Sequence, residues 1–292
     1  MIVYVDDIII TGDNDKEIEM LKRQLTREFE VKDLGQLRYF LGIEVSRSAR
    51  GIYLSQRKYI LDLLAETRMI GCRPVSTPIE PNLHLIKDGG VPVDREEYQR
   101  LVGRLIYLSH TRPDIAFAVS VVSQFMHNPQ NHHMDDVMRI IRYLKGCPGK
   151  GLLYTSNDNL QVECYTDADW AGSLDDRRST SGYCTFVGGN LVTWRSKKQS
   201  VVARSTAKAE LRAIAHGVCE VLWLKILLLE LGLFQSKPLM LYCDNKAALD
   251  IVHNPVQHSR TKHIEIDQTL YQGKTRSTNS LHAIYKFFKP NS

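Results

Sequence analysis

Residues 165–172 read YTDADWAG. The first five of them end a segment, Val162–Asp169, that the sequence predicts to be a β-strand. The pattern beyond it predicts two more strands, a long helix, a fourth strand and a short helix: Ser181–Val187, Leu191–Trp194, Thr206–Leu231, Leu239–Cys243 and Lys246–His253. Residues 188–190, Gly-Gly-Asn, supply the hairpin turn between the second and third strands. Three strands, a helix, a strand and a helix describe a mixed α/β layer.

The first half of the chain is patterned differently. Hairpins are predicted at residues 2–11 and 39–55, and helices at residues 16–29, 56–70, 96–109, 114–126 and 134–145. A long loop rich in Pro and Gly separates the helix at residues 56–70 from the helix at residues 96–109. The segment Cys147–Gly151, which also contains Pro and Gly, closes this half, and we place a domain boundary there.

The composition is that of an ordinary globular protein. The 292 residues are 43% hydrophobic and 24% charged, which is enough to bury a substantial core and makes two domains the first expectation. The excess of 38 Lys and Arg over 33 Asp and Glu gives a formal charge of only +5, so a basic surface must come from local clusters. Nucleic acid is therefore a permitted partner but not a required one.

Cysteine spacing and apolar segments indicate the compartment. The six cysteines include no Cys-x-x-Cys pair and no His at zinc-ligand spacing, which argues against a disulfide framework and a structural metal site. The apolar N-terminal run is interrupted by Asp6 and Asp7 and lacks the other features of a signal peptide. The longest apolar segment, Val218–Leu233, contains three charged residues and is not a membrane span. We expect a soluble intracellular protein, cytoplasmic or nuclear, without membrane contact.

Adjacent carboxylates stand in a predicted turn near the start of the chain, in the sequence YVDD at residues 4–7. Two neighbouring like charges disfavour joint ionisation unless a cation offsets them, and a metal site is one remedy. On four residues alone, a solvated Asp-Asp turn would be the favoured interpretation. The segment resembles the YVDD box of reverse transcriptases, and the match continues through residues 8–12, IIITG, as in copia-type retroelements. The resemblance implies that Asp6 and Asp7 are magnesium ligands on a palm hairpin.

Further segments of the first half resemble the same family in the same order. Residues 40–45 resemble its primer-grip hairpin, and five later stretches match its connection to ribonuclease H: residues 77–78, 98, 101–108, 111–115 and 142–146. The resemblance therefore covers about the whole first half. A polymerase also needs a further palm aspartate and nucleotide-binding fingers, which would lie before Met1. Polymerisation by this chain alone is not expected.

Three acids of the second half lie in the order strand, helix and strand end: Asp167, Glu210 and Asp244. Each taken singly would usually be solvated, but their order and flanking residues resemble the ribonuclease H of copia-type elements. The resemblance implies that they bind two magnesium ions, one to activate water and one to stabilise the leaving oxygen of the RNA strand. Asp169 points to the same face of the strand as Asp167, so spacing alone does not decide between them. Asp167 occupies the family's position.

The densest basic stretch near these acids consists of five residues: Arg195, Lys197, Lys198, Arg204 and Lys208. We expect them to contact the phosphates of an RNA–DNA hybrid, in which case affinity would fall as the salt concentration rises. The alternative is a solvated connection between a strand and a helix. The sequence HSRTKHIE at residues 258–265 also matches the family and is expected to open a structural helix.

The resemblance stops after Asp267. The family continues with a last strand and an aspartate that is the fourth metal ligand, whereas this chain has no acid from residue 268 to Ser292. Glu265 and Asp267 are poor substitutes, because their helix precedes the missing strand. Loss of a carboxylate weakens a metal position and loss of a strand exposes a sheet edge, so reduced activity is expected.

These observations predict an α/β (α+β) chain in three parts. Residues 1–150 are the C-terminal part of a reverse transcriptase, with a partial palm and a helical connection. Residues 151–267 are a ribonuclease H-like mixed-sheet α/β domain lacking its last strand, and 268–292 are a divergent tail. The predicted function is impaired Mg²⁺-dependent cleavage of RNA–DNA hybrids, with hybrid or other nucleic acid, and other parts of a retroelement polyprotein, as partners. The alternatives are an inactive remnant that at most binds nucleic acid, and a reverse transcriptase active only with its upstream part.

Overall fold

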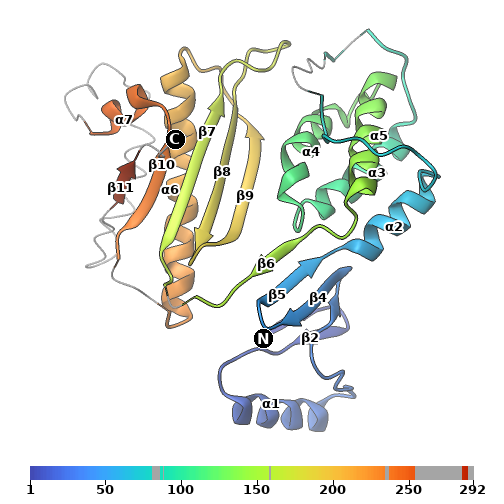
Figure 1. Cartoon of the computed structure of the whole chain (residues 1–292), viewed down its shortest axis with the longest axis vertical. Helices are drawn as coiled ribbons and strands as arrows, with labels where there is room; N and C mark the ends of the chain where they lie inside the picture. The colour runs from blue at the N-terminus through green and yellow to red at the C-terminus, as the bar shows by residue number, and fades with distance from the viewer. Residues whose placement is uncertain (81–85, 88, 158, 234–236, 254–284, 289–292) are drawn as a thin grey trace.

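The computed structural model describes residues 1–80, 86–87, 89–157, 159–233, 237–253 and 285–288, and for His253 and residues 285–288 it describes the backbone alone. The architecture is mixed α/β, as predicted. A small N-terminal unit lies at one end of the molecule, a helical unit lies at one side, and a five-stranded sheet packed against one long helix forms the other side (Figure 1).

The chain begins with a hairpin. β1 (Ile2–Tyr4) and β2 (Asp7–Ile9) pair in antiparallel fashion, and Val5 and Asp6 form the turn between them. Val5 has a φ of 48°, in the left-handed region that few side chains adopt. The prediction of strand, turn and strand over residues 2–11 is confirmed.

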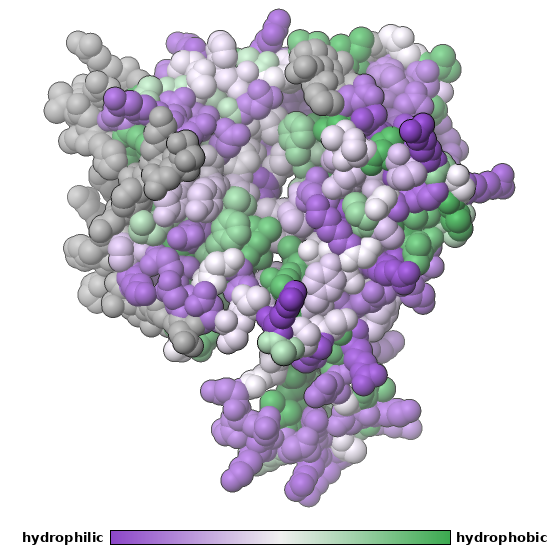
Figure 2. Space-filling model, viewed as in Figure 1, coloured by the Kyte–Doolittle hydropathy of each residue, from purple (hydrophilic) through white to green (hydrophobic). Residues whose placement is uncertain are grey.

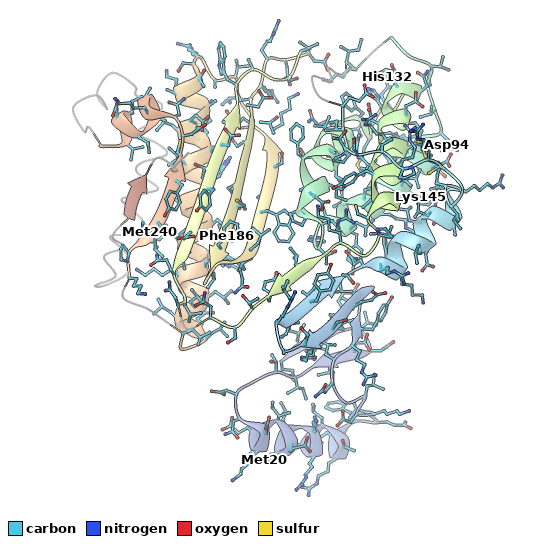
Figure 3. All side chains as sticks on the ribbon, in the orientation of Figure 1. Met20, Asp94, His132, Lys145, Phe186 and Met240 are labelled. Atoms are coloured by element: carbon cyan, nitrogen blue, oxygen red, sulfur yellow. The ribbon has the colours of Figure 1, made fainter. Side chains whose placement is uncertain are left out.

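A surface helix follows the hairpin. α1 (Asp15–Glu28) lies within one residue, at each end, of the predicted helix. The side-chain oxygen of Asn14 caps it by accepting hydrogen bonds from two backbone N–H groups of the first turn. No residue of α1 is buried, and Met20, labelled in Figure 3, is 63% exposed. Figure 2 shows hydrophilic side chains predominating over this end of the molecule, around smaller hydrophobic patches.

An antiparallel sheet links the N-terminal unit to the helical unit. Its strands, in spatial order, are β3 (Tyr39–Phe40), β4 (Ile43–Ser48), β5 (Gly51–Ser55) and β6 (Leu152–Tyr154). The predicted hairpin over residues 39–55 is confirmed, except that Leu41 and Gly42, with φ of 49° and 80°, interrupt its first strand. β6 was not predicted; it follows the predicted domain boundary and pairs with β5. A Cβ atom at Gly51 or Gly151 would collide with a carbonyl oxygen of the facing strand, so these two glycines permit the pairing.

The helical unit has its own core. Its elements are α2 (Arg57–Glu66), α3 (Arg95–Leu108), η1 (Pro113–Ile115), α4 (Ala116–Val122), η2 (Ser123–Phe125) and α5 (Asn131–Gly146). Buried side chains from all four α-helices form one cluster, in which the Tyr98 hydroxyl donates a hydrogen bond to the Val122 carbonyl at 2.7 Å. The helix predicted over residues 114–126 is divided into η1, α4 and η2, so its prediction as one element is wrong. Pro113 begins this run, as suits a helix start.

A buried ion pair lies within the helical unit. Arg112 is fully buried, and its Nε and Nη2 donate to the two carboxylate oxygens of Asp114 at 2.9 Å each, while its Nη1 donates to the Cys147 carbonyl at 3.0 Å. The Tyr143 hydroxyl also donates to Asp114, at 2.7 Å. Burial acts to raise the pKa of Asp114, but the hydrogen bonds from Arg112 and Tyr143 hold that pKa well below its usual range.

The largest sheet contains five strands. In chain order they are β7 (Val162–Asp169), β8 (Thr180–Val187), β9 (Asn190–Lys198), β10 (Leu239–Cys243) and β11 (Tyr285–Phe288). Their spatial order is β11-β10-β7-β8-β9, with β7, β8 and β9 antiparallel and with β10 parallel to both β7 and β11. The predicted mixed layer is confirmed. Its predicted lack of a last strand is wrong, because β11 extends the sheet beyond β10.

One long helix covers this sheet. α6 (Thr206–Glu230) crosses β7 and its neighbours, and α7 (Lys246–His253) follows β10 (Figure 1). A Cβ atom at Gly217 would lie 2.6 Å from Thr166 Cγ2 and 2.9 Å from Cys164 Sγ, so glycine lets α6 approach β7 closely. Across the parts of the chain that the structure describes, no helix combines the length and the apolar character needed to cross a bilayer.

β9 connects the large sheet to the helical unit. The indole Nε1 of Trp194 donates a hydrogen bond to the Ser109 carbonyl at 3.0 Å, and the hydroxyls of Ser196 and Ser120 lie 3.5 Å apart. Because side chains alternate along a strand, the residues between and beyond these two, Arg195 and Lys197, face the other side of the sheet. β9 therefore contributes side chains to two surfaces, the contact with the helical unit and the opposite face of the sheet.

We expect Trp194→Phe to lower the free energy of unfolding by about 1 kcal/mol, the usual contribution of one hydrogen bond whose acceptor loses its donor. Trp223→Phe is the matched control, since Trp223 is 51% exposed on α6 and should change stability little. Urea unfolding followed by circular dichroism measures both. Equal effects of the two substitutions would show that the Trp194–Ser109 hydrogen bond adds nothing.

Candidate functional site

Three predicted acids meet at one end of the large sheet. Asp167 lies near the end of β7, Asp244 directly follows β10, and Glu210 lies near the start of α6. β7 and β10 are parallel, with Thr166 opposite Cys243, so the next residue on each strand is an aspartate and the two stand side by side. The carboxyl ends of parallel strands are where the fold gathers such groups.

Hydrogen bonds connect this cluster. The backbone N–H of Ala168 donates to Asp167 Oδ1 at 2.8 Å and to Glu210 Oε1 at 3.3 Å, which brings the two carboxylates to one donor. The Cys243 thiol lies 3.7 Å from Glu210 Oε2. One ligating atom each of Glu210, Cys243 and Asp244 lies within 4.8 Å of the others. The structure therefore brings together the three acids and adds a thiol.

The electrostatics of the cluster favour a cation. Glu210 is 3% exposed, and burial, together with the charges of Asp167 and Asp244, raises its pKa to about 7, against the N–H of Ala168, which lowers it. A divalent cation would offset this repulsion. Three carboxylates are the hard oxygen donors that magnesium takes, so the residues fit that ion.

The side chain of Asp169 lies against the turn that follows β7. Its carboxylate lies against the backbone of Gly172, where a Cβ atom would collide with it. Asp167 instead shares the Ala168 N–H with Glu210. The geometry thus groups Asp167, rather than Asp169, with the other acids.

The two aspartates of the N-terminal hairpin do not join this site. Asp6 and Asp7 are exposed at the turn between β1 and β2, and Figure 1 shows that hairpin at the opposite end of the molecule from the carboxyl end of β7. Within the described residues, neither belongs to a group of three side chains that could hold a metal ion. Their role as metal ligands stays a prediction.

The five predicted basic residues have different environments. Arg195 and Lys197 are exposed on β9, Arg204 is exposed before α6, and Lys208 is partly buried in its first turn. Lys198 differs, since its Nζ donates to Ser173 Oγ at 2.8 Å and lies 2.9 Å from Asp176 Oδ1. Although burial acts to raise the pKa of Asp176, the hydrogen bonds from Lys198 and Ser173 lower it to about 2. Lys198 stabilises this loop.

A hollow between β8, β9 and α6 contains two of the predicted basic residues. It is lined by Ser181, Tyr183, Arg195, Lys197, His216, Cys219 and Glu220. The Tyr183 hydroxyl donates to Glu220 Oε2 at 2.9 Å. Burial is the larger cause, and this hydrogen bond the second, that raises the pKa of Tyr183 to about 12. Tyr183 and Glu220 could not be predicted from the sequence, because only the packing of α6 on β8 brings them together. Cys243 was not predicted either, although its position directly before Asp244 could have indicated it.

Two comparisons with known sequences describe the relationships of the chain. Residues 1–81 match the family model described as reverse transcriptase (RNA-dependent DNA polymerase). A retrovirus-related Pol polyprotein from transposon RE1 of Arabidopsis thaliana is 46% identical over 95% of this chain, and the chain spans 19% of its length. An uncharacterized mitochondrial protein of the same plant is 41% identical over 76% of this chain and 93% of its own length. A putative transposon Ty5-1 protein of Saccharomyces cerevisiae is 33% identical over 75% of this chain and 72% of its own length.

Among solved structures, a crystal structure of LC11-RNase H1 in complex with RNA/DNA hybrid aligns with 44% of this chain and 85% of its own. The TM-score is 0.30 and the sequence identity is 10%.

Proposed function

The chain belongs to the retrovirus-related Pol polyproteins of copia-type transposons, and from this premise we propose that it binds RNA–DNA hybrids and cleaves their RNA strand. The observation that carries the proposal is the convergence of Asp167, Glu210 and Asp244 at one end of the sheet.

Asp167, Glu210 and Asp244 would hold magnesium, which when bound supplies activation of water and stabilisation of the leaving oxygen. The chain's own contribution is positional. The Ala168 N–H orients two of the carboxylates, and the rigid register of β7 and β10 fixes the separation of the two aspartates. Glu210 is 3% exposed, so the packing around it restricts the movement of its carboxylate. Arg195 and Lys197 would contact phosphates of the bound strands.

The decisive experiment incubates the purified chain with magnesium and a labelled RNA–DNA hybrid, beside an Asp167→Asn variant. We expect cleavage by the chain and a rate at least about 100-fold lower in the variant, because a lost metal ligand removes several kcal/mol of charge stabilisation. Binding of the hybrid without cleavage by either protein would support an inactive remnant instead.

A polymerase activity is the second candidate, and the match of residues 1–81 to the reverse transcriptase family favours it. On this proposal Asp6 and Asp7 would act only together with the upstream part of the polyprotein. Extension of a primed template after addition of that part, and its loss in an Asp7→Asn variant, would support the candidate. No extension in the mixture would exclude it.

Salt dependence tests the basic residues one by one. Lys197→Ala is expected to reduce the slope of log affinity against log salt by about 1, since each phosphate contact releases about one counterion. Lys198→Ala is the matched control, because the Lys198 ammonium is already paired with Asp176 and should leave the slope unchanged. Fluorescence anisotropy of a labelled hybrid across a sodium chloride series measures both slopes. Equal slopes for Lys197→Ala and the unaltered chain would remove Lys197 from the interface.

A further inference from the structure

Cys243 forms part of the wall of the carboxylate site. It is the last residue of β10 and is 1% exposed, and its Sγ lies 3.7 Å from Glu210 Oε2. Asp244 follows it directly, and the ligating atoms of all three side chains lie within 4.8 Å of one another. In the described part of the chain, no other group of three such side chains is as close.

These distances suit a metal ion that accepts sulfur. Zinc–sulfur and zinc–oxygen bonds of about 2.3 and 2.1 Å at a tetrahedral angle place the sulfur and oxygen about 3.6 Å apart. The observed separation of 3.7 Å between Cys243 Sγ and Glu210 Oε2 is close to that value. Magnesium gains nothing from the thiol because it takes oxygen ligands, whereas softer divalent ions prefer a thiolate. The donor set therefore contains both sulfur and oxygen, and two of its residues, Glu210 and Asp244, are also proposed magnesium ligands.

We propose that Glu210, Cys243 and Asp244 form a binding site for a thiophilic divalent cation such as Zn²⁺ or Cd²⁺, which excludes magnesium from the carboxylates that the two ions share. The metal forms a bond to the Cys243 sulfur, and the thiol proton passes to the buffer. The inhibitory consequence rests on the proposed nuclease function, but the binding itself does not. Cleavage would then be inhibited by soft cations at concentrations far below that of magnesium.

Cadmium titration tests the binding directly. Cd²⁺ is added to the metal-free chain, and the ultraviolet charge-transfer absorption of the cadmium–thiolate bond is recorded. We expect Cys243→Ser to lose one equivalent of this absorption and to bind Cd²⁺ at least about tenfold more weakly, because removal of a ligand costs no less than removal of an outer-shell partner. Cys164→Ser is the matched control, since Cys164 is equally buried, in the neighbouring strand β7.

A second variant keeps the test independent of the thiol. Asp244→Asn retains Cys243 and should weaken Cd²⁺ binding while preserving the absorption at saturation. Thermal melts establish that each variant is folded. A Cys243→Ser chain that binds Cd²⁺ with unchanged absorption and affinity would overturn the proposal, because the signal would then come from other cysteines.

The inhibition is measured as residual hybrid cleavage in Cd²⁺, relative to each variant's rate in magnesium alone. Cys243→Ser should need about tenfold more Cd²⁺ for half-inhibition than either the unaltered chain or Cys164→Ser. Equal sensitivity of all three would overturn the inhibitory part. If no variant cleaves the hybrid in magnesium, the nuclease function fails, whereas the absorption titration still decides whether the metal site exists.

Discussion

Replacing Glu210 by Gln is expected to lower the rate of magnesium-dependent hybrid cleavage by about 100-fold or more, and to make the metal-free chain more stable at neutral pH. The first effect follows from loss of one of the three proposed metal ligands. The second follows because Glu210 is buried close to Asp167 and Asp244, where its charge is costly without a cation. Opposite changes in activity and stability are typical of a functional site.

The stability effect has a defined pH window. The pKa of Glu210 is raised from 4.5 to about 7 in the folded chain, so between these values the unfolded chain releases a proton that the folded chain keeps. Stability therefore falls as pH rises from about 4.5 to about 7 and is constant above, with a loss of up to about 3 kcal/mol. Glu210→Gln should abolish this loss.

Urea unfolding from pH 4.5 to pH 8, in the presence of a chelator, measures the pH dependence. Glu230→Gln is the matched control, because Glu230 is exposed at the end of the same helix. Adding magnesium at pH 8 should stabilise the unaltered chain more than Glu210→Gln. If the two variants show the same pH slope as the unaltered chain, Glu210 is not the group that holds the proton.

Arg112→Met is expected to lower the free energy of unfolding by about 3 kcal/mol or more. The substitution removes four hydrogen bonds, two to the Asp114 carboxylate and one each to the Cys147 carbonyl and Sγ. It leaves the Asp114 carboxylate without its main partner and the Cys147 carbonyl without its donor. Removing one member of a buried ion pair is costly because the other charge stays desolvated. Since the pKa of Asp114 is lowered, the stability that this pair contributes is present above the ordinary carboxyl pKa and is lost as pH falls.

Thermal and urea denaturation measure the Arg112 effect. Arg139→Met is the control, because Arg139 pairs with the exposed Glu80, and such pairs contribute about 1 kcal/mol or less. Adding Asp114→Asn to Arg112→Met should recover part of the loss. A double variant no more stable than Arg112→Met would mean that lost packing, and not the unpaired charge, causes the effect.

The strands of the large sheet could be predicted well because their signals are local. β7 and β10 have the predicted bounds, since each apolar segment ends at polar or turn residues. β6 was missed because three residues carry too little pattern, and its pairing partner, β5, lies about 100 residues earlier in the chain. β11 was missed although its sequence, YKFF, contains the aromatic residues typical of strands, because four residues carry too short a pattern to decide.

The candidate site was predictable in its acids but not in their surroundings. The order of Asp167, Glu210 and Asp244, together with the resemblance of their flanking residues to the copia-type ribonuclease H, predicted the cluster that the fold brings together. The contact of Cys243 with Glu210 and the pairing of Lys198 with Asp176 depend on side chains from separate elements. Such contacts arise from packing, which residue order and local pattern do not encode.

Because the two faces of β9 make different contacts, the strand limits which insertions and deletions its coding sequence can accept. Inserting or deleting a single codon within this strand would turn Trp194 toward the hollow and bring the flanking cations against the helical unit. A two-codon change would restore the alternation and so would be better tolerated. A substitution in β9 therefore changes one surface only, whereas a single-codon insertion or deletion would disrupt both surfaces together.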